Sequence, residues 1–127
     1  MKEMMNQSIA YGMAEPVPYP SPLQLTIMGY DAVIRDLNMA KRYHLERAAD
    51  AAFERNDHAQ RLITELLLGL DYEQGGEIAG NLSKLYDFAI RQLVGIGLGT
   101  DPRIYDDLIS IFGNLKEAWI KLDAQMS

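Results

Sequence analysis

Cysteine is absent from the 127 residues of this sequence. This absence excludes disulfide frameworks, cysteine nucleophiles and thiolate metal sites, and it suits a reducing cytoplasm. Basic residues are in the minority, because 12 Lys and Arg stand against 18 Asp and Glu, for a formal net charge of −6. A surface of that sign repels a phosphate backbone, so we expect no nucleic-acid partner.

Long hydrophobic runs are missing as well. No uninterrupted apolar stretch approaches the roughly 18 residues of a membrane span. The first residues, Met1 to Asn6, lack the apolar region and cleavage site of a secretory signal. We therefore expect a cytoplasmic protein with no membrane insertion. The length and the 48% of hydrophobic residues are those of one folded domain with a substantial core.

Proline is concentrated near the start of the chain. Four of the five prolines lie within a short stretch, at Pro16, Pro18, Pro20 and Pro22. Proline fixes φ and disfavours a helix at the residue before it. We therefore predict an extended arm over residues 1–20 and a folded body over residues 21–127. The arm carries apolar side chains such as Ile9 and Tyr11, which an exposed segment does not need for its own structure, so we expect these two to bind a partner or the body.

The body begins with a helix signal. Ser21 reads as an N-cap, Pro22 as the first helical residue and Gln24 as the residue that closes a capping box. Apolar residues then recur at helical spacing, at Leu23, Ile27, Tyr30, Ile34 and Leu37. No glycine or proline follows before Gly69, so the sequence leaves two possibilities open. The first two helices form a hairpin with a hinge around residues 46–50, or they form one continuous rod that is exchanged between two protomers.

Three more amphipathic helices are expected. The second follows the apolar stripe from Ala52 to Leu70, and we expect the chain to reverse at Gln74–Gly76. The third is predicted from about Glu77 to Gly95, and the fourth from the Thr100-Asp101-Pro102 start signal to the end. Asp71, Glu77 and Asn81 read as turn and cap residues, and Trp119 as a core anchor. Because strand alternation is also absent, the predicted fold is all-α, an antiparallel four-helix bundle with an extended N-terminal arm.

The sequence contains no clear motif of a catalytic or metal site. Ferritin-like centres need Glu three residues before His, but Lys41 precedes His44 and Arg55 precedes His58, so we expect both histidines at the solvated surface. Phosphotransfer on His44 is a distant alternative. The glycines from Gly95 to Gly99 follow a helix and lack a P-loop lysine, so they are read as a helix end. We predict a protein that is not an enzyme and has no metal site and no cofactor.

Several short motifs together resemble one family. They are Ser21-Pro22-Leu23-Gln24-Leu25, Met28-Gly29-Tyr30-Asp31, Leu70-Asp71, Gly75-Gly76-Glu77-Ile78-Ala79, Asn81-Leu82, Leu85-Tyr86-Asp87 and Glu117-Ala118-Trp119. In this order and spacing, over residues 8 to 122, the sequence resembles the flagellar export chaperone family FliS. The resemblance implies a cytosolic four-helix bundle that binds the disordered C-terminal segment of flagellin, prevents premature polymerisation and helps deliver flagellin to the flagellar export apparatus.

The resemblance also suggests where such a partner binds. Ala10-Tyr11 resembles an N-terminal motif that covers part of the partner's site in that family. The body residues chosen as candidates for partner binding are Leu25, Met28, Tyr30, Leu82, Leu85 and Tyr86. Periodicity alone places Leu82, Leu85 and Tyr86 in the core and makes Met28 an ordinary core candidate. Gly29 weakens the first helix and is expected to open a groove there.

A second function remains open. The chain could be a helical-bundle scaffold or co-chaperone of the flagellar system that no longer binds flagellin. A homodimer that buries the same apolar grooves would favour this alternative.

Overall fold

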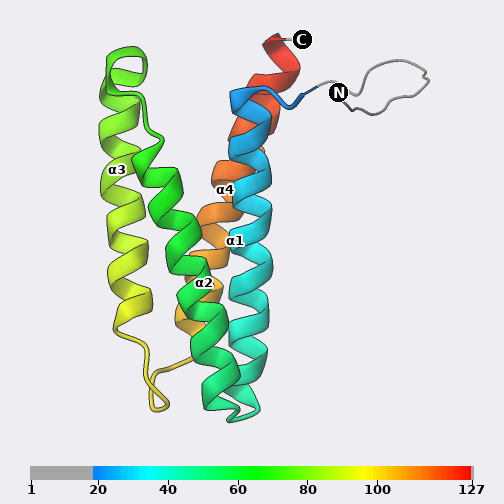
Figure 1. The fold of residues 1–127 in the computed structure, drawn as a ribbon, viewed down its shortest axis with the longest axis vertical. Helices are drawn as coiled ribbons and strands as arrows, with labels where there is room; N and C mark the ends of the chain where they lie inside the picture. Colours follow the sequence, from blue (N-terminus) through cyan, green and yellow to red (C-terminus); the bar gives the residue numbers. More distant parts are fainter. Residues whose placement is uncertain (1–18, 127) are drawn as a thin grey trace, which may run out of the picture.

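A computed structural model of the chain describes residues 19–126. Four helices make up this part: α1 (Pro22–Leu45), α2 (Ala49–Leu68), α3 (Tyr72–Val94) and α4 (Arg103–Met126). They alternate in direction along one axis (Figure 1), and α1 packs against α2 and α4 while α2 packs against α3. Residues 19–126 contain no strand. The predicted all-α, antiparallel four-helix bundle is therefore confirmed.

The start of α1 follows the predicted chemistry. The backbone N–H of Gln24 donates to Ser21 Oγ at 3.1 Å, and the backbone N–H of Ser21 donates to Gln24 Oε1 at 3.0 Å. Both bonds satisfy backbone groups that the first helical turn leaves without partners. The capping box and Pro22 fix the residue at which the helix begins.

The α1–α2 connection is a tight turn, so the two helices form a hairpin and not a continuous rod. α1 ends at Leu45, and the turn spans residues 46–48, within the predicted hinge. Arg47 adopts φ 63°, and the backbone N–H of Ala48 donates to the Tyr43 carbonyl at 2.9 Å. A left-handed residue of this kind reverses a helix end without glycine or proline.

α3 consists of two helical pieces joined at the non-helical Gly76. The long piece follows Gly76, as predicted, but the single turn before it was not predicted. This turn begins at Tyr72 and is capped by Asp71, whose side chain accepts the backbone N–H of Gln74 at 3.0 Å. The α2–α3 connection spans residues 69–71, and the predicted turn at Gln74–Gly76 coincides with the kink at Gly76 between the two pieces. The cap role expected for Asp71 is confirmed.

The core runs the length of the bundle. Its buried apolar members come from all four helices: Tyr30, Val33, Leu37, Ala40, Ala59, Ile63, Leu82, Tyr86, Ala89, Leu93, Tyr105, Leu108 and Phe112. Gly95 is the C-cap of α3, so the glycines that begin there mark a helix end, as predicted. Every helix in residues 19–126 is too short or too polar to cross a bilayer.

The expectation of a solvated side chain was wrong for His44, whereas 43% of the His58 side chain is exposed. His44 is 7% exposed, and its Nε2 lies 2.9 Å from the Thr100 carbonyl oxygen of the α3–α4 connection. His58 is half-buried, and its Nδ1 contacts the carboxylate of the fully buried Asp36, which also accepts from Arg55 Nη1 at 3.1 Å. A burial of this kind is tolerated because each polar group has a partner. His44 is therefore not an exposed phosphate acceptor.

Candidate functional site

Residues 19–126 form an apolar groove at the end of the bundle where α1 begins and α2 ends. It has a volume of about 590 Å³. All four helices and the α2–α3 connection contribute to its lining: Leu25, Thr26, Gly29, Leu62, Glu65, Leu66, Gly69, Leu70, Asp71, Gln74, Gly75, Ile78, Ala79, Leu82, Tyr86 and Trp119. We call this feature the groove.

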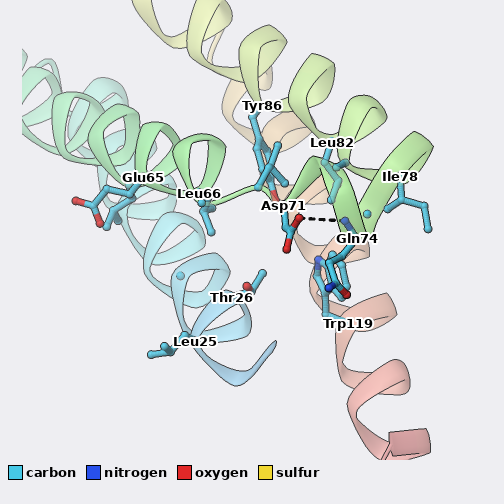
Figure 2. A pocket seen from close by; sticks show the side chains of 16 residues that line it. Leu25, Thr26, Glu65, Leu66, Asp71, Gln74, Ile78, Leu82, Tyr86 and Trp119 are labelled. Atoms are coloured by element: carbon cyan, nitrogen blue, oxygen red, sulfur yellow. Dashed lines mark hydrogen bonds between the residues drawn. The ribbon is translucent and has the colours of Figure 1, made fainter. Parts of the chain in front are cut away.

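Apolar side chains form opposite walls of the groove. Figure 2 shows Leu25 and Leu66 on one side and Ile78 and Leu82 on the other. Leu25 is 54% exposed and Ile78 is 64% exposed, although both are large apolar residues. Leaving such surface in water is unfavourable, so two exposed walls facing each other are typical of a binding site for an apolar ligand.

Gly29 brings α1 and α2 close together beside the groove. A Cβ atom at this position would lie 3.1 Å from Leu66 Cδ2, which is tighter than ordinary van der Waals contact. Glycine therefore leaves room for Leu66 in the α2 wall. Gly29 is among the lining residues of the groove, and α1 runs unbroken through it.

Three aromatic side chains are joined by hydrogen bonds beneath and beside the groove. Trp119 Nε1 donates to the Tyr30 hydroxyl at 2.7 Å, and the hydroxyls of Tyr30 and Tyr86 lie 2.5 Å apart. Tyr30 also packs against Phe112, with ring centroids 5.8 Å apart. The three bonded groups come from α1, α3 and α4, so this network ties together three of the four helices that line the groove.

The same network is electrically neutral at ordinary pH. Burial raises the pKa of the Tyr30 hydroxyl, and burial also raises the pKa of the Tyr86 hydroxyl far above its ordinary value. Neither oxygen is therefore available as an anion. Within residues 19–126, no cluster of three or more His, Asp or Glu is arranged to hold a metal ion. The chemistry that the groove offers is the binding of apolar surface.

The structure places the predicted binding residues in different surroundings. Leu25, Leu82 and Tyr86 line the groove, and Tyr30 is fully buried beneath it. Met28 and Leu85 lie outside the lining. Met28 is 55% exposed and so is not a core residue, whereas Leu85 is half-buried. Ile9 and Tyr11 lie outside the described residues.

Sequence reasoning missed several residues of the groove. Ile78 and Leu66 belong to regular apolar stripes, which give no sign that a residue near the end of a stripe remains uncovered. Trp119 was expected to be a core anchor, but it is half-buried, lines the groove and binds Tyr30. A tryptophan with one polar N–H often lies where an apolar core meets a binding surface, and this is the signal that could have identified it.

Comparison of the sequence with known proteins identifies one family. The family described as "Flagellar protein FliS" matches residues 4–126. The flagellar secretion chaperone FliS of Salmonella typhimurium is 35% identical over 108 residues, which are 84% of this chain and 80% of the relative. The protein of the same name from Campylobacter jejuni is 32% identical over 108 residues, 78% of this chain and 77% of the relative. The Vibrio cholerae protein is 41% identical over 66 residues, 52% of this chain and 48% of the relative. The chain therefore belongs to the FliS family of flagellar proteins.

Proposed function

We propose that this protein is a cytoplasmic export chaperone for flagellin. It binds the disordered C-terminal segment of flagellin, prevents premature polymerisation and assists delivery to the flagellar export apparatus. Membership of the FliS family supports the chaperone role, because the relatives are named flagellar secretion chaperones. No chemical step is assigned to the protein.

The observation that carries this proposal is the exposed apolar groove. A disordered segment that folds as a helix on binding can bury an apolar stripe against such walls. The groove has a volume of about 590 Å³, which is large enough to hold several apolar side chains. Its residues Leu25 and Ile78 would lose much of their exposed surface in the complex, which supplies a hydrophobic driving force.

The N-terminal arm has a place in the same proposal. Ile9 and Tyr11 of the predicted arm, residues 1–20, would occupy part of the groove in the free protein and leave it when flagellin binds. Met28 and Leu85 would contact parts of the flagellin segment that extend beyond the groove, since Met28 is exposed on α1 close to Gly29.

A calorimetric titration with a synthetic peptide of the flagellin C-terminal segment tests the groove as the binding site. Ile78→Glu places a charge on one wall at an exposed position, so the fold should survive while binding weakens. Phe88→Glu is the matched control, because Phe88 is also on α3, is 47% exposed and does not line the groove. We expect a loss of about tenfold or more in affinity for Ile78→Glu, equivalent to one desolvated charge against an apolar partner.

Equal affinities for both variants would place the binding site elsewhere. Absence of binding by the folded wild-type protein would overturn the flagellin proposal. In that case the scaffold or co-chaperone function, with a homodimer that buries the groove, would take its place, and the molar mass in solution would test it.

A further inference from the structure

α3 is bent one turn after its start. Gly76 has φ 49° and ψ −122°, which separates the single turn at residues 72–75 from the long remainder of the helix. A positive φ with this ψ is unfavourable for any residue that carries a Cβ atom. A Cβ built on Gly76 would meet no atom within 4 Å. Glycine is thus required at this position by the backbone conformation and not by lack of space.

The bend folds the first turn of the helix back toward the turn that follows. A Cβ built on Gly75 would lie 2.9 Å from the Cβ of Ala79. In a regular helix the Cβ atoms of residues four apart are separated by roughly 5–6 Å. Ala79 is buried and lines the groove. The turn from Asp71 to Gly75 therefore leans over the side of α3 that faces the groove.

Residues on both sides of the bend line the groove. Asp71, Gln74 and Gly75 precede it, and Ile78 and Ala79 follow it. The hydrogen bond from the Gln74 backbone N–H to Asp71 Oδ1 keeps this turn in shape. The folded turn is thus a short separate wall, joined to the rest of α3 by a glycine.

Trp119 of α4 and Gln74 of this wall both line the groove, and Figure 2 labels both side chains. Trp119 is the only tryptophan of the chain, so tryptophan fluorescence reports on the surroundings of this one groove residue.

We infer that the turn from Asp71 to Gly75, folded inward at Gly76, forms an end wall that positions the bound flagellin segment, with Gly75 and Gly76 as the positioning residues. The inference rests on the proposed function. Gly76 sets the direction of the wall, and Gly75 allows it to approach Ala79. A helix that enters the groove would meet this wall at one end, so the wall fixes how far along the groove the segment binds.

Two substitutions displace the wall in different ways. Gly76→Ala disfavours the bent backbone while it adds a methyl group to open space, and Gly75→Ala forces the turn away from the Ala79 Cβ. Gly80→Ala is the matched control, because Gly80 is also in α3 and a Cβ there meets no atom within 4 Å. Circular dichroism and thermal unfolding verify that each variant is folded.

The first readout is acrylamide quenching of Trp119 fluorescence in the free protein. We expect stronger quenching in Gly75→Ala and Gly76→Ala than in the wild type, and no change in Gly80→Ala. The second readout is calorimetric titration with the flagellin peptide. We expect about tenfold lower affinity for Gly75→Ala and Gly76→Ala, because each variant must restore an unfavourable backbone conformation before the wall can contact the peptide. The control should remain within about twofold, because a change outside the groove leaves binding nearly unaffected.

The two readouts separate the inference from the proposed function. Wild-type binding with unchanged affinity in both wall variants would overturn the inference and leave the flagellin proposal intact. Absence of wild-type binding would overturn the flagellin proposal, and with it the role of the wall in positioning flagellin, whatever the quenching. If Gly75 and Gly76 serve the fold alone, the unfolding temperature will fall while quenching and peptide affinity stay at wild-type values, which would also overturn the inference.

Discussion

Removal of the Tyr30 hydroxyl should cost more stability than removal of the Tyr86 hydroxyl, although the two face each other. The Tyr30 oxygen lies at the centre of the network, since it accepts from Trp119 Nε1 at 2.7 Å and lies 2.5 Å from the Tyr86 oxygen. Tyr86→Phe removes one of these contacts and leaves the bond with Trp119. Tyr30→Phe removes both contacts at once.

The magnitudes follow from the burial of the groups that lose a partner. Tyr86→Phe should lower the free energy of unfolding by about 1 kcal/mol, the net value of one hydrogen bond. Tyr30→Phe leaves two groups without the partner they had, the Tyr86 hydroxyl, which is nearly fully buried, and the half-buried Trp119 N–H. A buried group without a partner costs about 1–3 kcal/mol, so we expect a loss of about 3 kcal/mol for Tyr30→Phe.

Urea unfolding followed by far-ultraviolet circular dichroism measures these differences, with an unchanged m-value as the check that the unfolded states are comparable. Tyr72→Phe is the control, because Tyr72 is an exposed tyrosine at the start of α3 and its loss should have almost no effect. The double variant should lose about 1–2 kcal/mol less than the two single losses together, since both remove the same contact. Additive losses, or a larger loss for Tyr86→Phe than for Tyr30→Phe, would refute this description of the network.

Three further perturbations have defined outcomes. Burial raises the pKa of Tyr30, Tyr86 and Tyr105 above the ordinary value of 10.0. The stability that their neutral hydroxyls contribute is therefore present below about pH 10 and is lost above it, by about 1.4 kcal/mol per pH unit for each tyrosine that ionises only on unfolding. Urea unfolding at a series of alkaline pH values measures this loss. Asp36→Ala should lower the free energy of unfolding by about 3 kcal/mol, because Arg55 is then left partly buried without its carboxylate partner. A loss below about 1 kcal/mol in the same urea assay, which is the value of an exposed ion pair, would contradict this. Gly29→Ala should push Leu66 into the groove and weaken binding of the flagellin peptide several-fold in calorimetry. The alanine also favours the helix, which raises the free energy of unfolding by up to about 1 kcal/mol. Unchanged affinity would show that the α2 wall does not touch the peptide.

Local chemistry made the helices predictable wherever a side chain acts on its own backbone. Ser21, Pro22 and Gln24 satisfy the first turn of α1 with groups that lie within four residues, so the sequence alone predicts that helix start. The first turn of α3 was missed because two glycines suggested a loop, whereas Asp71 caps a helical turn before them. A glycine pair is compatible with a reversal and with a bend inside a helix, and the choice depends on what the bent turn packs against.

Properties that depend on packing between helices were harder to predict. The charged neighbours of His44 in the sequence point to a solvated side chain, but Thr100 from the α3–α4 connection supplies a carbonyl that makes its burial tolerable. In the groove, Leu25, Leu82 and Tyr86 were predicted through a family resemblance. Periodicity could not separate Ile78, which remains exposed, from Leu82 one turn later, which is covered. Only the positions of the neighbouring helices decide this difference.

The most direct measurement is a calorimetric titration of the full chain with a peptide of the flagellin C-terminal segment from the same source, repeated after deletion of residues 1–20. The proposed function predicts tight binding with one site per chain, strengthened by the deletion because Ile9 and Tyr11 no longer compete for the groove. If neither the full chain nor the deletion variant binds the peptide, with both shown to be folded, this result would contradict the assignment of flagellin as the partner.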